Sequence, residues 1–190
     1  MNPAHFIIGD TVILRPIEPE DLAFIQTWVN DPEVRAGLGE YRPASRHALQ
    51  KWLDRVYEDV NRVWFVSVLK ENNRVIGDGG FLRIDQVWRT ADISICVGEK
   101  DVWRRGYGTE VMHLMLDYGF GTLNLHRIAL GVFTFHEQAI RFYEAIGFRR
   151  EGVLRDGIFH AHAYHDVILM SLLEDEYRAM QGPFSMREKG

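Results

Sequence analysis

One segment of the chain, residues 91–118, constrains the fold more than any other. Ala91–Val97 (ADISICV) is predicted to form a strand, and a polar loop leads from it to the glycine turn Gly106-Tyr107-Gly108. Apolar residues then recur at helical spacing, at Val111, Leu114, Met115 and Tyr118. A helix that begins at a glycine turn presents free backbone N–H groups and a partial positive charge, so this segment favours binding of a phosphate group.

The glycine turn by itself is a weak signal, and a purely structural turn explains it equally well. The turn lacks the third glycine of the dinucleotide fingerprint and the Gly-Lys-Ser/Thr of a nucleoside-triphosphate loop, so neither NAD nor ATP is favoured. Arg104 and Arg105 could add charge for a pyrophosphate, although arginines at a helix start are commonly just solvated.

The rest of the chain alternates strands and helices. A first helix is expected to open at Glu20 and to end at the turn signal Asn30-Asp31-Pro32. Ser45 is expected to cap a second helix with apolar positions from Leu49 to Val60. The order of elements predicts a mixed α/β fold, with further strands and helices at Thr11–Ile17, Val63–Leu69, Arg74–Ile84, His126–Phe133, Gln138–Ile146 and Val167–Leu173.

Size and composition fit one domain over residues 1–190, with a core of about 10–173 and a C-terminal tail of about 174–190. The net charge of -5 gives no basic field for nucleic acid and suits a cationic or amine ligand better. A single cysteine, Cys96, excludes an internal disulfide framework and favours a reducing, cytoplasmic compartment. No segment reaches the ~18 apolar residues that span a bilayer, so no membrane partner is expected.

Two runs of sequence resemble a known family. DISICVGEKDVWRRGYGTEVMHLMLDYGF is similar to the acyl-CoA pyrophosphate motif of the GNAT superfamily of N-acetyltransferases, and RFYEAIGF at residues 141–148 is similar to its second signature. LRPIEPEDLAFIQTWVNDPEV and HDVILMSLL resemble the branch that acetylates ribosomal-protein N-termini and spermidine. The resemblance spans about residues 12–173. It implies a single domain with a central, mostly antiparallel, twisted sheet flanked by helices and splayed around an acyl-CoA site.

The resemblance also implies roles for particular residues. The backbone of Ile95, Cys96 and Val97 would pair with the pantetheine arm like an added strand, with the Val97 N–H polarising the thioester carbonyl. Tyr143 would return a proton to the departing thiolate; without the motif it would be taken for a core aromatic. Two further candidates for binding acetyl-CoA depart from the family pattern: Trp103 stands where the family often has glutamine or arginine, and His136 stands where it often has asparagine. The remaining candidates are Arg104, Arg105, Gly106, Tyr107, Gly108 and Thr109.

An acceptor amine that arrives protonated needs acidic groups and a general base. In the family that the chain resembles, the segment between the first two helices borders the acceptor cleft. The candidates for acceptor binding are Asp31, Glu33 and Glu40 from this segment, and Asp78 and Asp92 from the predicted strands. The residues leave the general base open among Asp78, which lies among glycines that indicate a bulge, Asp92, Glu99, the histidines near the C-terminus and a water relay. Each acid is more readily explained as a solvated or salt-bridged carboxylate than as a catalyst.

Three histidines near the C-terminus, His160, His162 and His165, raise the question of a metal site. Strand alternation would put His160 and His162 on one face and His165 on the other, and no cysteine lies nearby. We therefore expect no metal, and an acceptor-pocket or surface role for these histidines.

The resemblance implies an N-acyltransferase that moves an acetyl group from acetyl-CoA to a primary amine by direct attack in a ternary complex. Cys96 is not expected to be a nucleophile. We expect a small polar acceptor, a polyamine or an aminoglycoside-type antibiotic. A homodimer is compatible with the sequence. The alternatives are a protein N-terminal acetyltransferase of the ribosomal-protein type, another acyl donor such as succinyl-CoA, and a non-catalytic CoA-binding regulatory domain.

Overall fold

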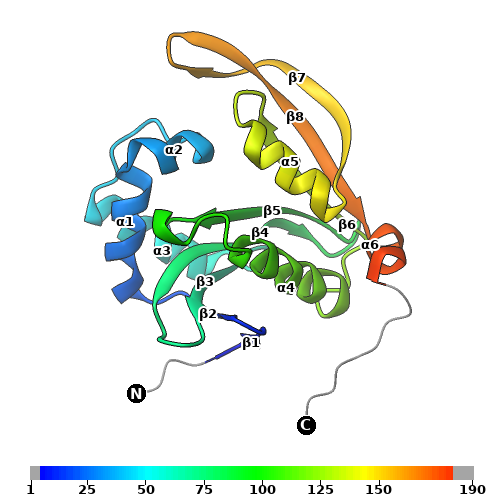
Figure 1. Cartoon of the computed structure of the whole chain (residues 1–190), viewed down its shortest axis with the longest axis horizontal. Coiled ribbons are helices and arrows are strands. Elements are labelled where there is room, and N and C mark those ends of the chain that lie inside the picture. Colours follow the sequence, from blue (N-terminus) through cyan, green and yellow to red (C-terminus); the bar gives the residue numbers. More distant parts are fainter. Residues whose placement is uncertain (1–4, 182–190) are drawn as a thin grey trace.

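In the computed structural model, which describes residues 5–181, the chain forms an eight-stranded sheet with helices around it (Figure 1). Neighbouring strands are antiparallel except for β5 and β6, which are parallel, so the predicted mixed α/β fold with a mostly antiparallel sheet is confirmed. In sheet order the strands are β1 (Ile7–Ile8), β2 (Val12–Pro16), β3 (Val63–Leu69), β4 (Val75–Asp85), β5 (Thr90–Val97), β6 (Arg127–Phe133), β8 (Ala163–Leu173) and β7 (Arg149–His160).

Helices cover both faces of the sheet. On one face, Met112 of α4 is fully buried against a core that includes Phe81 of the sheet. On the other face, Trp28 of α1 and Leu53 of α3 share a core with Val66 of β3. The helices are α1 (Leu22–Asn30), α2 (Pro32–Leu38), α3 (Arg46–Glu58), α4 (Tyr107–Gly121), α5 (Glu137–Ile146) and α6 (Glu174–Gln181), with short 3-10 turns η1 (Pro19–Asp21) and η2 (Lys100–Val102).

The predicted start of α3 is confirmed, whereas its end is shorter than the sequence indicates. The Ser45 hydroxyl caps the helix by accepting a hydrogen bond from the Ala48 N–H at 3.2 Å. The prediction that Val60 lies on the buried face is wrong, because the helix ends at Glu58 and Val60 is 91% exposed.

Helix α2 lies in the segment that was expected to connect the first two helices. Asn30 ends α1 as predicted, but Pro32 then occupies the first turn of a new helix, where its missing N–H costs nothing. The Asp31 carboxylate caps this helix by accepting from the N–H groups of Glu33 and Val34 at 2.9 and 3.2 Å. One Asn-Asp-Pro sequence therefore both ends α1 and begins α2.

Helix α6 brings the first part of the expected tail into the core. Tyr177 is 3% exposed, its ring lies 5.2 Å from that of Phe120, and its hydroxyl donates to Asp117 at 2.7 Å. Residues 182–190 of the expected tail, and residues 1–4 at the other end, lie outside the described residues. Between residues 5 and 181, no helix is both long and apolar enough to cross a membrane.

The predicted placement of the C-terminal histidines on opposite faces is wrong. β7 ends at His160, and Ala161 and His162 form the turn of the hairpin with positive φ angles of 49° and 67°, so alternation does not continue across them. The rings of His160 and His165 both pack on Phe135, at centroid distances of 4.6 and 5.0 Å. Within residues 5–181, no group of three His, Cys, Asp or Glu side chains is arranged to hold a metal.

The sheet opens between its two parallel strands. β5 and β6 pair only at Thr90–Arg127, Ala91–Ile128 and Asp92–Ala129, and beyond these pairs they diverge. The second half of β5, Ile93–Val97, therefore keeps one edge of backbone N–H and C=O groups without a strand partner from β6.

The buried ion pair between Arg15 and Asp21 gives a test of the fold. Two hydrogen bonds of 2.7 and 2.6 Å join the side chains, which are 10% and 3% exposed. Asp21→Asn should lower the free energy of unfolding, measured with urea, by about 3 kcal/mol, because it leaves the guanidinium buried without its anion. The double variant Arg15→Met/Asp21→Leu should recover much of that loss, and a loss below about 1 kcal/mol for Asp21→Asn would show that the pair behaves as a surface pair.

Candidate active site

A cavity of about 370 Å³ lies where β5 and β6 diverge. Four parts of the chain enclose it: α2, the second half of β5, the loop and first turn of α4, and α5 with its capping residue. The lining residues are Glu33, Val34, Gly37, Leu38, Ile95, Cys96, Val97, Trp103, Arg104, Gly106, Gly108, Thr109, His136, Gln138, Ala139, Phe142 and Tyr143.

The structure brings most of the residues expected to bind the cofactor together in this cavity. Two of them, Arg105 and Tyr107, are not among its lining residues in the described part of the chain. The Arg105 side chain is exposed, and Tyr107 packs against the core beneath α4. Arg104, Gly106 and Gly108 therefore line the cavity, while Arg105 faces solvent and Tyr107 faces the core.

The N-terminus of α4 opens onto the cavity through its glycines. Gly106 caps the helix with a φ of 89°, a conformation that side chains with a Cβ rarely adopt. A Cβ on Gly108 would meet the nearest protein atom, in Val97, only at 3.4 Å, which is an ordinary contact. The protein's own packing therefore does not require a glycine at residue 108, and the bare backbone there lies open to the cavity.

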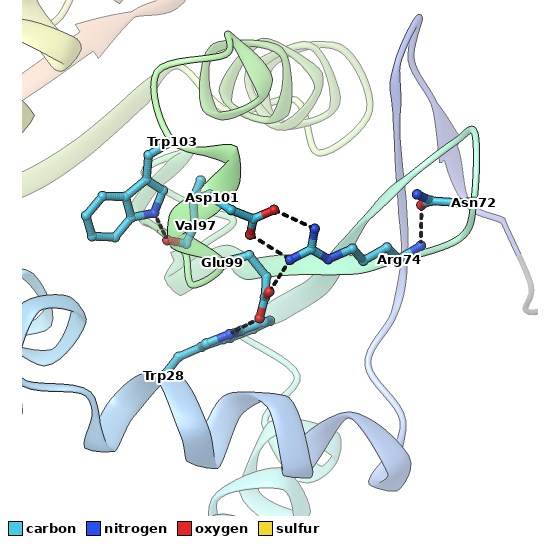
Figure 2. A network of polar contacts seen from close by, with 7 residues as sticks. All are labelled: Trp28, Asn72, Arg74, Val97, Glu99, Asp101 and Trp103. Carbon is cyan, nitrogen blue, oxygen red and sulfur yellow. Dashed lines mark hydrogen bonds and ion pairs between the residues drawn. The ribbon is translucent and has the colours of Figure 1, made fainter.

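Trp103 ties the glycine loop to the end of β5. Its indole N–H donates to the Val97 carbonyl at 2.7 Å (Figure 2). The tryptophan that departs from the usual family pattern thus holds the last residue of β5 and also lines the cavity.

A polar network fixes the loop between β5 and α4 from below (Figure 2). The Trp28 indole of α1 donates to Glu99 at 2.9 Å, and Arg74 of the β3–β4 turn bonds both Glu99 and Asp101. Hydrogen bonds to Asp101 and Glu99 raise the pKa of Arg74, so its charge is secure. Because both oxygens of Glu99 are engaged, this residue has a structural role and is a poor candidate for the general base.

Lys100 connects the same loop to α2. Its ammonium lies 2.8 Å from Asp31 and 3.4 Å from Glu33. The hydrogen bond from Lys100, together with those from the α2 backbone, holds the pKa of Asp31 below its usual value. Asp31 therefore caps a helix, and of the acidic candidates between α1 and α3 it is Glu33 that lines the cavity, while Glu40 is exposed.

The two acidic candidates on the strands lie in different surroundings. Asp92 pairs with Arg83 and is not among the lining residues of the cavity. Asp78 is 7% exposed, and burial raises its pKa to about 6, although a hydrogen bond from the Trp64 indole at 2.8 Å opposes the shift. Trp64 and Asp78 belong to neighbouring strands, so their contact depends on the strand register, which no pattern in the sequence indicated.

Tyr143 and His136 enter the cavity from α5. Burial raises the pKa of Tyr143 to about 12, so its phenol stays protonated at neutral pH. Burial also raises the pKa of the neighbouring Cys96 thiol well above its usual value. His136 caps α5, since its Nδ1 accepts from the Ala139 N–H at 3.2 Å, and its Nε2 lies next to Gly37 of α2.

Comparison with known proteins agrees with this geometry. A sequence profile of the Acetyltransferase (GNAT) domain matches residues 11–149. The uncharacterized N-acetyltransferase p20 of Bacillus licheniformis is 33% identical over 173 residues, covering 88% of this chain and 96% of that protein. A ribosomal N-acetyltransferase-like protein of Bacillus subtilis, YdaF, is 25% identical over 177 residues, covering 90% and 95%.

Solved structures of a spermidine N-acetyltransferase from Vibrio cholerae share the fold. The complex of that enzyme with CoA and spermine has a TM-score of 0.83 at 28% identity, over 89% of this chain and 99% of that chain. A dodecameric structure of the same enzyme has a TM-score of 0.79 at 28% identity, over 92% and 100%. The chain thus belongs to the GNAT family of N-acetyltransferases, with acetyl-CoA as its co-substrate.

Proposed function

We propose that this enzyme acetylates the primary amine of a small polar molecule, a polyamine or an aminoglycoside-type compound, by direct attack in a ternary complex. The observation that carries the proposal is that the open edge of β5, the N-terminus of α4, Tyr143 and the acidic Glu33 of α2 all line one cavity. Donor and acceptor groups can therefore face each other across one space.

The donor half of the cavity suits acetyl-CoA. The free N–H groups at Gly106 and Gly108 would hold the pyrophosphate, supported by Arg104. The pantetheine arm would extend the sheet along Ile93–Val97, because β6 has left that edge unpaired. The acetyl carbonyl would then lie near the Val97 N–H, which stabilises negative charge on its oxygen.

In the reaction, the amine nitrogen attacks the acetyl carbon and the carbon–sulfur bond breaks. Tyr143 gives its proton to the departing thiolate; with a pKa of about 12, it is fully protonated when needed. The raised pKa of Cys96 leaves little thiolate there, which supports direct transfer over an acetyl-cysteine intermediate.

The acceptor half of the cavity suits a cation. Glu33 lines the cavity from α2, and the chain carries 27 acidic against 22 basic residues. The Vibrio cholerae relative is a spermidine N-acetyltransferase with a structure that contains spermine, which supports an amine of this class here.

The second candidate is acetylation of a ribosomal-protein N-terminus, supported by the likeness to the Bacillus subtilis protein. A catalytically silent CoA-binding domain is less well supported, because Tyr143 lines the cavity. We also propose that the enzyme works in the cytoplasm, as its single cysteine suggests.

We further propose that the enzyme self-associates, beginning from the expected homodimer. β7 is an edge strand, and the β7–β8 hairpin exposes Val153, Leu154, Phe159 and Tyr164, each more than half exposed. The dodecamer of the Vibrio cholerae relative supports this proposal.

Release of free CoA from acetyl-CoA, followed with a thiol reagent, tests the acceptor. We expect turnover with polyamines or aminoglycosides, with a KM for the amine that rises with added salt more than the KM for acetyl-CoA does, because salt screens the attraction to Glu33. Far higher kcat/KM for a ribosomal-protein N-terminal peptide would contradict the acceptor assignment and leave the enzyme class intact.

Gly108→Val tests the phosphate site. The added methyl groups should weaken CoA binding at least about tenfold by calorimetry, because they cover the backbone N–H groups that the pyrophosphate approaches. Gly121→Val, at the other end of α4, is the matched control, since a Cβ there meets no atom within 4 Å and a Cβ at residue 108 meets none closer than 3.4 Å. Equal affinities for the two variants would exclude the N-terminus of α4 as the phosphate site.

Tyr143→Phe tests the general acid. The variant keeps the ring and its packing but has no proton to give, so kcat should fall by ~10²-fold or more with little change in acetyl-CoA affinity. Single-turnover and steady-state rates would check this. A variant as fast as the parent enzyme would mean that another group protonates the thiolate.

A further inference from the structure

The structure contains one buried carboxyl group that neither the fold nor the proposed donor site explains. Asp78 and Asp21 are the buried acidic residues between residues 5 and 181, and Asp21 has Arg15 as its cation. Asp78 has no cation partner in the described chain, and its hydrogen-bond donor is the Trp64 indole. Burying a carboxylate without a cation lowers the stability of the fold. A group that is kept buried despite this cost is a candidate for a functional residue.

Asp78 lies directly behind the cavity wall. It is the antiparallel partner of Cys96, so both side chains project from the same face of the sheet, with Cβ atoms roughly 5 Å apart. The strands approach closely here: a Cβ on Gly77 would lie 2.1 Å from the Cys96 carbonyl oxygen. Cys96 itself lines the cavity, so Asp78 lies one strand back from the cavity, next to the Cys96 side chain.

The carboxyl group also lies on the acceptor side of the sheet. Cys96 and Trp64 pack against the core that α1, α2 and α3 cover, and α2 contributes Glu33 to the cavity. Tyr143 lines the same cavity from α5. The Cys96 thiol is close enough to contribute to the raised pKa of the Tyr143 phenol. An acid and a carboxylate therefore flank the same residue of β5 from opposite sides.

The groups around Asp78 set its readiness to accept a proton. Burial raises its pKa to about 6, the Trp64 hydrogen bond lowers it, and the charge of Asp21 raises it. The titratable or charged groups that face it are the Cys96 thiol from β5 and Asp21 from η1, which is itself held by Arg15 of β2. With a pKa of about 6 the carboxyl group is mostly ionised at pH 7.5, so it can accept a proton there.

We propose that Asp78 accepts, through one bridging water, the proton that the acceptor ammonium must lose before its nitrogen can attack. The inference rests on the proposed function. The ammonium loses two protons on its way to the amide. One passes to Asp78 and then to solvent; the other replaces the proton that Tyr143 gives to the thiolate as the carbon–sulfur bond breaks.

The test is the pH dependence of kcat at saturating acetyl-CoA and polyamine. The parent enzyme should lose activity as the pH falls through about 6, because Asp78 becomes protonated. Asp78→Asn should lower the plateau by ~10²-fold and remove this limb. Trp64→Phe removes a hydrogen bond that favours the carboxylate, so the limb should move to higher pH. Trp52→Phe is the matched control, because Trp52 packs edge-on against Trp64 but the hydrogen bond to Asp78 comes from Trp64. The low-pH limb of this variant should not move.

Thermal unfolding separates this role from a structural one. In the folded chain the pKa of Asp78 lies above its unfolded value of 3.8, so the fold favours the protonated form and its stability falls as the pH rises from that value through about 6. Asp78→Asn should therefore melt at or above the parent temperature at pH 8, with a smaller difference at pH 5.

Three results would overturn the proposal: Asp78→Asn with parental kcat, an unchanged low-pH limb in that variant, or a melting temperature well below that of the parent at pH 8. Absence of any amine-dependent CoA release by the parent enzyme would instead refute the proposed function. The two failures are therefore distinguishable.

Discussion

The divergence of β5 from β6 is the feature on which the site depends. Three residue pairs join these strands, and after Asp92–Ala129 β5 remains paired only with β4 and β6 only with β8. Unpaired backbone groups inside a protein need partners, so the open edge of β5 favours an extended ligand that can supply them. The cavity, the exposed edge and the facing helix α5 all follow from this loss of pairing.

A site built on an open sheet needs support from elsewhere, and the loop between β5 and α4 receives it from three directions. Trp28 supports it from α1 and Arg74 from the β3–β4 turn (Figure 2). Asp31, at the start of α2, supports it through a hydrogen bond from Lys100 of the loop. Gly98 leaves room for this arrangement, because a Cβ there would lie 2.0 Å from the Trp28 ring. The loop that carries the glycine turn is thus tied to α1 and to the start of α2.

Much of the fold and of the donor half of the site could be predicted from the sequence, because local signals encode them. The glycine turn before α4 and the Ser45 cap are contiguous patterns. Contacts between distant segments left no such signal. The pairing of Trp64 with Asp78 depends on strand register, and the packing of His160 and His165 on Phe135 depends on a hairpin turn that interrupts alternation.

Initial-rate kinetics with acetyl-CoA and a polyamine varied together test the central claim, direct transfer within one cavity, most directly. The account predicts lines that intersect in a double-reciprocal plot and no acetyl group on Cys96 after incubation with acetyl-CoA alone, as judged by mass spectrometry of the intact protein. Parallel lines together with an acetylated Cys96 would contradict it, because they would show that the acetyl group first moves to the protein.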